Sequence, residues 1–452
     1  MTDLHKPPRP PLHTILPPLL LGTATFNTQY VSDPEAMPYR DIVARAISLG
    51  VTGFDTSPYY GPSETLLGAA LDSLLNPAGG SSSAPVARES LFLVTKAGRI
   101  ASAEFDYSPS WVRYSVLRSL KRLHTPYLDL VYMHDVEFVS ADEVVAAVRE
   151  LRRLRDEDGV VRYVGISGFP VDVLCGLAER VLRETGEPLD AVLSYGHCTV
   201  QNRKLGLPWV EQVGTGGRGQ QQPENKGSPL ARFNKAGVQV VLNASILGMG
   251  LLTSRGIPAD PPEAAAAASE SSPLAKWHPS PPKLRLACKE LAALAEQAGE
   301  RLESVAIRWS LAEWARVGGA AGLGVDVSTP DGEALRVGPT VCGVTSVPEL
   351  EETVAEWSGV LRSLQKFSSG SAGQDDAYGA ARQEKVLDLV RNKLWPTLGS
   401  WLDYAWDSPD EGYKNTRKES DRGVVPADGV MEEYEKAKRE RKGVARSVPE
   451  AR

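Results

Sequence analysis

The 452-residue sequence has few cysteines and no apolar run long enough to cross a membrane. Its four cysteines lie far apart, without a CxxC pair, so we expect neither a disulfide framework nor a zinc site; they are Cys175, Cys198, Cys288 and Cys342. The N-terminal segment also lacks an apolar core of signal-peptide length. These absences predict a cytoplasmic protein with reduced thiols and no membrane partner.

Basic stripes and metal-ligand spacings are also missing. The formal net charge is −7, and no run of lysine and arginine interleaves with aromatic residues, so we expect no nucleic-acid partner. The six histidines show no HxxH-type spacing, which argues against a metal site. With 42% apolar and 24% charged residues, the composition is that of an ordinary globular protein.

From Leu19 onward, short apolar runs alternate with helical patterns. The runs predict strands at 19–22, 53–55, 91–95, 128–134, 161–167, 191–195, 238–244 and 340–344. The helical patterns fall at 36–50, 63–75, 110–123, 141–157, 170–185, 230–236, 303–314 and 348–364. Eight such units in series predict an α/β fold, a (β/α)8 TIM barrel. A doubly wound sheet is the alternative, but it favours a glycine-rich turn after the first strand, where only Gly22 stands.

The predicted barrel occupies residues 15–366, between a proline-rich segment (1–14) and a partly helical C-terminal extension (367–452). Four segments rich in Gly, Ser, Ala, Pro or Gln are predicted to be flexible insertions or linkers, at 213–228, 258–273, 318–339 and 367–377. The extension contains helical patterns at 384–395 and 431–445. Its Trp401, Tyr404 and Trp406 are expected to dock onto the barrel, and we assign the extension no chemistry.

Four polar residues follow or end three successive predicted strands. Asp55 ends the second strand, with Tyr60 five residues later, Lys96 follows the third and His134 ends the fourth. Each has an ordinary structural explanation: a turn aspartate, a packed tyrosine, a solvated lysine and a core histidine. Because the carboxyl ends of barrel strands share one face, the four together predict a catalytic site instead.

These residue types suit proton transfer at a carbonyl or alcohol. A phenol ionises near pH ~10, and we expect the Lys96 ammonium to lower that pKa for Tyr60. Asp55 would hold Lys96 by an ion pair, and His134 would bond the substrate oxygen. No side chain can store a hydride, so a nicotinamide cofactor is implied.

Later strand ends supply candidate contacts to that cofactor. Ser167 could bond the nicotinamide carboxamide, although a helix N-cap is an equal explanation. Ser245 and Leu247 begin a loop after the seventh strand. Gly343 and Ser346 precede a helix whose N-terminus could hold a phosphate.

The stretch Phe54-Asp55-Thr56-Ser57-Pro58-Tyr59-Tyr60-Gly61, with Ser63-Glu64 and Leu67-Gly68, resembles the signature of the aldo-keto reductases. Lys96 and His134 also fall where that family places its lysine and histidine, and the resemblance covers about residues 15–365. It implies that Tyr60 is the proton donor and acceptor, that Lys96 and Asp55 tune it, and that His134 orients substrate.

The likeness is closer to the D-arabinose and L-galactose dehydrogenase branch, at residues 134–138, 166–170, 194–197, 249–253, 277–279 and 342–347. It implies oxidation of a sugar's anomeric hydroxyl to an aldonolactone with NAD. The insertions and the tryptophan-containing tail are similar to those of fungal D-arabinose dehydrogenases, which feed erythroascorbate synthesis.

The resemblance also bears on the cofactor. Many members have asparagine at the position of Gly168, whereas the closer branch has glycine there, as this chain does. Tyr195 is the candidate for stacking on the nicotinamide. Residues 345–352 contain no Lys or Arg to pair with a 2′-phosphate, and their acidic residues favour NAD over NADP. The full set of candidate cofactor contacts is Gly22, Asp55, Ser167, Gly168, Tyr195, Ser245, Leu247, Gly343, Ser346 and Glu352.

Two other functions stay open. An NADPH-dependent aldehyde or ketone reductase would use the same four residues, and a basic residue near 345–352 in space would favour it. A cofactor-binding regulatory subunit would instead show a stable partner and slow turnover. For the preferred hypothesis, a sugar dehydrogenase, we expect a small-molecule sugar substrate and a monomer or weak homodimer.

Overall fold

A computed structural model describes residues 9–77, 84–207, 227–259, 273–328, 334–369 and 374–447. Eight parallel strands close into a barrel in the order β1–β12–β9–β8–β7–β6–β3–β2. Their bounds are β1 Leu19–Gly22, β2 Gly53–Asp55, β3 Phe92–Ala97, β6 Leu128–His134, β7 Val161–Gly168, β8 Ala191–Tyr195, β9 Val240–Ala244 and β12 Thr340–Gly343. The predicted (β/α)8 barrel is confirmed, and the doubly wound alternative is excluded.

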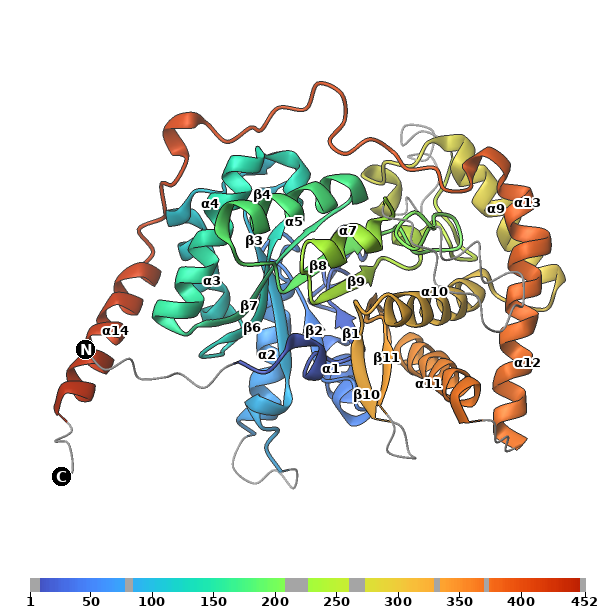
Figure 1. The fold of residues 1–452 in the computed structure, drawn as a ribbon, viewed down its shortest axis with the longest axis horizontal. Coiled ribbons are helices and arrows are strands. Elements are labelled where there is room, and N and C mark those ends of the chain that lie inside the picture. The colour runs from blue at the N-terminus through green and yellow to red at the C-terminus, as the bar shows by residue number, and fades with distance from the viewer. Residues whose placement is uncertain are drawn as a thin grey trace.

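Helices surround the barrel (Figure 1). They are α1 Tyr39–Ser48, α2 Ser63–Leu75, α3 Pro109–Arg122, α4 Ala141–Arg153, α5 Val171–Thr185, α7 Pro229–Lys235, α10 Leu302–Ala320 and α11 Val347–Ser369. The strands are buried nearly throughout, which explains why they read as continuous apolar runs. Within the described ranges, no helix has the length and apolarity that a membrane span requires.

Two of the four predicted flexible segments contain regular helix or strand over the residues that the structure describes. In segment 318–339, α10 continues to Ala320, and β10 (Val325–Ser328) pairs antiparallel with β11 (Ala334–Val337). Its glycines allow close packing: a Cβ on Gly319 would lie 2.1 Å from the Arg336 carbonyl oxygen. In segment 367–377, α11 extends to Ser369 and α12 (Gln374–Leu389) begins five residues later. Segments 213–228 and 258–273 lie almost wholly outside the described residues.

The prediction also missed two elements. Helix α9 (Pro282–Gln297) precedes α10, and its buried Leu284, Leu291 and Ala295 recur at helical spacing. A short antiparallel hairpin follows β3, formed by β4 (Arg99–Ala101) and β5 (Glu104–Phe105). This hairpin brings Arg99 to the carboxyl face of the barrel.

The C-terminal extension wraps around the barrel (Figure 1). After α12 and α13 (Trp395–Leu398) the chain crosses the top of the view, and α14 (Val430–Ser447) then packs on α3. Trp401, Tyr404 and Trp406 pack against the core, as predicted. The Trp406 ring stacks on Phe169, with centroids 4.7 Å apart, so the extension reaches the loop that follows β7.

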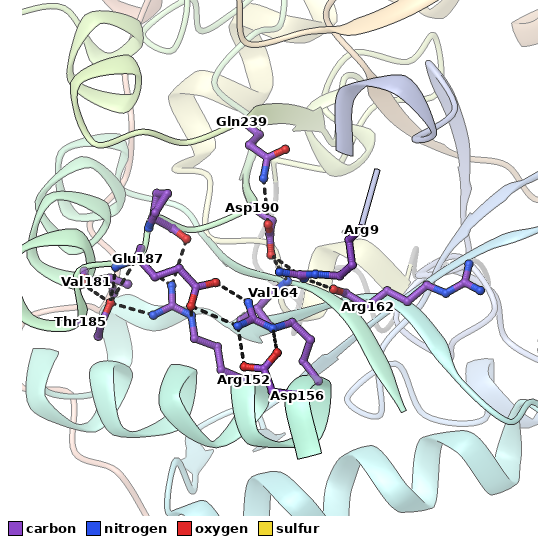
Figure 2. A network of polar contacts seen from close by, with 12 residues as sticks. Arg9, Arg152, Asp156, Arg162, Val164, Val181, Thr185, Glu187, Asp190 and Gln239 are labelled. Carbon is purple, nitrogen blue, oxygen red and sulfur yellow. Dashed lines mark hydrogen bonds and ion pairs between the residues drawn. The ribbon is translucent and has the colours of Figure 1, made fainter. Parts of the chain in front are cut away.

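At the opposite, amino end of the barrel, the N-terminal segment is held by a polar network (Figure 2). Arg9 bonds the Arg162 carbonyl oxygen and lies 3.9 Å from the Asp190 carboxylate. Asp190 in turn accepts hydrogen bonds from the Val164 amide (2.8 Å) and the Gln239 side chain (2.9 Å). Both of its oxygens are therefore engaged within the protein.

Candidate active site

A cavity of about 150 Å³ lies among the carboxyl ends of the strands. The residues predicted from sequence that line it are Asp55, Tyr60, Lys96, His134, Ser167, Tyr195 and Ser245. Further lining residues are Ala24, Gln29, Tyr30, Tyr59, Arg99, Asp135, Leu193, Ala244, Met249 and Trp277. The strands thus bring the four predicted catalytic residues into one cavity.

Asp55 and Lys96 form a buried ion pair at the ends of neighbouring strands. The Lys96 ammonium donates to Asp55 Oδ1 at 2.6 Å and to the Thr56 carbonyl oxygen at 3.0 Å. Burial raises the pKa of the Asp55 carboxyl, and Lys96 offsets part of that rise. β2 and β3 are adjacent in the barrel and Asp55 pairs with Val94, so Lys96 lies two residues beyond that partner, within reach of the Asp55 carboxylate.

Tyr60 lies beside this pair. The Lys96 nitrogen is 4.8 Å from the centroid of the Tyr60 ring. Burial raises the pKa of the Tyr60 phenol well above its ordinary value, and the Asp55 and Asp135 carboxylates raise it further. The net direction is therefore opposite to the predicted lowering, because desolvation and the two carboxylates outweigh the lowering effect, which comes from the Arg99 guanidinium.

His134 is neutral and held by a serine. Burial lowers the pKa of its imidazole to about 3. Its Nδ1 lies 3.0 Å from Ser57 Oγ, which also accepts the Tyr59 backbone N–H at 3.1 Å. When the Ser57 hydroxyl donates a hydrogen bond to Nδ1, the proton of the neutral imidazole is on Nε2. Nε2 is then the ring nitrogen that can donate a hydrogen bond. The ring also packs edge-on against Tyr60, with centroids 5.6 Å apart.

A second ion pair lies next to His134. Asp135 directly follows β6, and its Oδ2 is bonded by Arg99 and lies 3.6 Å from His134 Nε2. The Arg99 guanidinium stacks on the Tyr59 ring, 3.9 Å from its centroid. None of Arg99, Asp135 and Tyr59 is among the site residues predicted from sequence. The sequence indicates two of them only by position, because Asp135 directly follows His134 and Tyr59 directly precedes Tyr60.

The later strands supply the rest of the cavity wall. Ser167 lies at the end of β7 and donates to the Met133 carbonyl oxygen at 3.3 Å. Tyr195 ends β8, with Phe169 packed against it at 5.4 Å between ring centroids. Ser245 follows β9 in the left-handed backbone region, with φ 56°, and begins the loop that contains Leu247. Ser167 is a strand residue; the N-cap of α5 is Pro170.

Farther from the cavity, α11 begins with an acidic first turn. The Glu349 carboxylate accepts the Thr345 backbone N–H at 2.7 Å. Two arginines from other helices approach the same turn. Arg45 bonds Glu351 at 2.7 Å, and Arg301 bonds Glu352. Both of these arginines are therefore already paired with a glutamate.

The remaining candidates do not line the cavity. Gly22 and Gly343 sit opposite each other in neighbouring strands β1 and β12. Gly168 packs against Glu137, whose Oε2 would lie 2.4 Å from a Cβ there. Among the described residues no group of three or more acidic, histidine or cysteine side chains could hold a metal ion.

Comparison with known proteins identifies the family. Residues 18–365 match the model of the aldo/keto reductase family. The chain belongs to the aldo/keto reductase family. As an aldo/keto reductase it is an NAD(P)-dependent oxidoreductase.

Two curated relatives of this aldo/keto reductase are sugar dehydrogenases by name. The D-arabinose 1-dehydrogenase of Saccharomyces cerevisiae is 36% identical over 354 residues, covering 78% of this chain and 86% of the relative. The L-galactose dehydrogenase of Arabidopsis thaliana is 31% identical over 360 residues, with the same two coverages. Among solved structures, the glycerol dehydrogenase of Gluconobacter oxydans is 20% identical with a TM-score of 0.49, covering 88% of this chain and 97% of that one.

The donor set of this aldo/keto reductase fits a nicotinamide cofactor. Ser167 and Tyr195 line the cavity from the ends of β7 and β8, and Ser245 lines it from the residue after β9. Hydroxyls suit a carboxamide or phosphate, and an aromatic face suits a planar ring. When bound, the nicotinamide supplies the hydride acceptor or donor that the side chains lack.

Proposed function

We propose that this aldo/keto reductase oxidises an aldose, such as D-arabinose or L-galactose, at C1 to its aldonolactone, with NAD as the oxidant. In this reaction Tyr60 would take the proton of the C1 hydroxyl, and the bound nicotinamide would supply the acceptor for the hydride of the C1–H bond. The supporting observation is that Asp55, Tyr60, Lys96 and His134 line one cavity in a chain whose relatives at 36% and 31% identity are named as sugar dehydrogenases.

Tyr60 is the proposed general acid and base. Its raised pKa keeps the phenol protonated at neutral pH, which suits proton donation to a carbonyl oxygen during reduction. Oxidation requires the reverse transfer, so aldose oxidation should gain rate as pH rises. Lys96, fixed by Asp55 beside the Tyr60 ring, is the cation that stabilises the phenolate when it forms.

His134 is proposed to orient the substrate. A neutral imidazole donates one hydrogen bond to an oxygen without bringing a second full charge next to Lys96. The edge-on packing of His134 against Tyr60 keeps the two groups side by side. Both can then contact the same substrate oxygen, one as hydrogen-bond donor and the other as proton carrier.

NAD is the proposed cofactor because of the first turn of α11. The Glu349 carboxylate already uses the Thr345 amide, and Glu351 and Glu352 lie in the same turn. A 2′-phosphate would meet these carboxylates, whereas the uncharged ribose hydroxyl of NAD would not. We further propose Ser167, Gly168, Tyr195, Ser245, Leu247, Gly22, Gly343, Ser346 and Glu352 as cofactor contacts.

The alternative, an NADPH-dependent aldehyde or ketone reductase, is favoured by one observation. Arg301 is 58% exposed and is bonded to Glu352, so its guanidinium could exchange that partner for a 2′-phosphate. Both functions use Tyr60, so the substrate and the cofactor must distinguish them.

The deciding experiment measures reduced-cofactor absorbance with D-arabinose, L-galactose, L-fucose or xylose and either NAD or NADP. Sugar-dependent reduction of NAD, lost by about 10²- to 10⁴-fold in Tyr60→Phe, is the expected result. NADPH-driven loss of simple aldehydes without any sugar oxidation would replace the proposal with the reductase. Slow turnover of both substrate classes by a protein in a stable complex would indicate the regulatory role.

A further inference from the structure

Asp135 is a charged residue of the cavity to which the proposed reaction assigns no role. It is buried, it lines the cavity, and its backbone is left-handed with φ 55°. Non-glycine residues adopt this conformation rarely, although aspartate tolerates it better than most. The turn directs Asp135 to the cavity immediately after the strand that ends in His134.

Only half of the Asp135 carboxylate has a partner. Its Oδ2 is bonded by Arg99, whereas Oδ1 is buried and has no hydrogen-bond partner within the part of the chain that the structure describes. Buried carboxylate oxygens ordinarily accept hydrogen bonds, because desolvating them without a partner is costly. An acceptor of this kind on a cavity wall suits a ligand that carries hydroxyl donors.

Arg99 keeps this acceptor charged and oriented. Burial raises the pKa of the Asp135 carboxyl, but the charge of the Arg99 guanidinium and its hydrogen bond hold that pKa below its ordinary value. Arg99 is itself fixed, because it stacks on Tyr59 and donates to the Ser102 carbonyl oxygen at 3.1 Å. The free oxygen therefore belongs to an ionised group with a defined position.

We propose that Asp135 Oδ1 is a hydroxyl-recognition site that accepts a hydrogen bond from the C2 hydroxyl of the aldose. This inference rests on the proposed function and adds the substrate group that is recognised. In this arrangement the reacting C1 oxygen contacts Tyr60 and His134. Asp135 follows His134 in the chain, and its arginine-bonded Oδ2 lies 3.6 Å from His134 Nε2. C2 carries the next hydroxyl along a sugar, so it is the donor nearest to Asp135. A simple aldehyde without hydroxyl groups leaves the same oxygen unpaired.

The test compares D-arabinose with its 2-deoxy analogue in the wild-type protein and in Asp135→Gly and Asp135→Asn. Glycine and asparagine both tolerate the left-handed turn, so neither change adds backbone strain. The wild type should prefer D-arabinose in kcat/KM by about 10- to 100-fold, the range for a hydrogen bond to a charged group. Asp135→Gly should bring the ratio close to one. Asp135→Asn should give an intermediate ratio, because a neutral acceptor binds a hydroxyl less strongly than a carboxylate.

Asp129→Asn is the matched control, since Asp129 is a buried, arginine-paired carboxylate near the start of the same strand, β6. It should leave the substrate ratio unchanged. An equal loss for both sugars in Asp135→Gly and Asp135→Asn, with the ratio preserved, would overturn the inference and leave Asp135 as a neighbour that supports His134. If the wild type oxidises the two sugars equally, only the recognition site is wrong. If it oxidises neither sugar and consumes NADPH with aldehydes, the proposed function itself is wrong.

Discussion

Two groups of buried carboxylates, one at each end of the barrel, differ in how many of their oxygens accept hydrogen bonds. At the amino end, both oxygens of Asp190 accept hydrogen bonds, and both oxygens of Asp129 do as well. At the carboxyl end, Asp55, Asp135 and Glu137 each have one oxygen engaged and one without a hydrogen-bond partner among the described residues. Other buried carboxylates on the carboxyl side, Glu64 and Asp106, are bonded at both oxygens. The half-bonded state therefore belongs to the three carboxylates at and beside the cavity rather than to every carboxylate at that end.

This difference teaches where stability and function reside. A fully bonded carboxylate ties neighbouring elements together, as Asp190 ties β7 to the chain before β9. A half-bonded one costs folding free energy, and in an enzyme such costs concentrate where a ligand will complete the bonding. The amino end therefore acts as the structural base, and the carboxyl end holds the unsatisfied groups that a substrate can use.

The largest effect is expected from breaking the Asp55–Lys96 pair. Lys96→Met leaves a buried carboxylate without its cation, which should lower the free energy of unfolding by about 3–5 kcal/mol. Turnover should fall by about 10²-fold or more, because Tyr60 loses the cation that stabilises its phenolate. Urea unfolding and cofactor absorbance measure the two losses.

The double variant Lys96→Met with Asp55→Leu separates the two effects. It removes both charges, so most of the stability should return, since apolar replacements of buried pairs are often tolerated. Activity should stay lost. Recovery of activity together with stability would mean that the pair only holds the fold.

At the amino end, Asp190→Ala should change stability alone. It strips the buried Val164 amide of its acceptor, at a cost of about 1–3 kcal/mol in unfolding free energy. The kcat and KM measured below the melting transition should match those of the wild type. A changed kcat would contradict the division of roles between the two ends.

Acid should weaken the carboxyl end through its buried histidines. Burial lowers the pKa of His134 and His197 to about 3, and that of His278 to about 4. Between these values and about 6.5, the unfolded chain binds protons that the native protein does not, so stability falls as pH drops. The expected slope is about 1.4 kcal/mol per pH unit for each histidine. Unfolding titrations at pH 7 and pH 5 measure it; His197→Asn should flatten the slope, while a change at exposed His124 should not.

The smallest effect is expected at Ser57. Removing its hydroxyl in Ser57→Ala takes away the partner of His134 Nδ1, so both imidazole tautomers become populated. We expect a fall in kcat of about 5- to 10-fold, equal to about one hydrogen bond, and a shift in the His134 ¹⁵N resonances. Ser119→Ala is the control, because that buried hydroxyl in α3 has no hydrogen-bond partner among the described residues. A normal ¹⁵N spectrum in Ser57→Ala would remove Ser57 from this role.

The convergence of the predicted site residues could be read from sequence because barrel topology does the positioning. Asp55, Lys96 and His134 end or lie near the ends of β2, β3 and β6, and parallel strands bring those ends together whatever the loops do. Arg99 could not be found this way. It lies in a short hairpin without a periodic pattern, and its place depends on contacts with Asp135 and Tyr59 that only the folded chain makes.

Two further errors have physical causes. Glycine was interpreted as flexibility in 318–339, whereas Gly319 and Gly324 allow the backbone of β11 to approach closely. The predicted shift of the Tyr60 pKa was in the wrong direction, because that direction depends on how burial and the Asp55 and Asp135 carboxylates balance against Arg99, which sequence did not place at the site. A strand pattern identifies which groups meet but not how strongly each is desolvated.

Barrel closure has a consequence for biosynthesis. The barrel closes where β1 pairs with β12, with Leu19 opposite Thr340 and Gly22 opposite Gly343. Because β12 comes late in the chain, one edge of β1 has no partner strand until most of the chain has been synthesised. Throughout translation, the free edge of β1 offers unpaired backbone groups to other nascent chains. Contacts this distant in sequence also form slowly once the whole chain is released. Assembly of this protein should therefore depend on shielding of that edge by chaperones until β12 arrives.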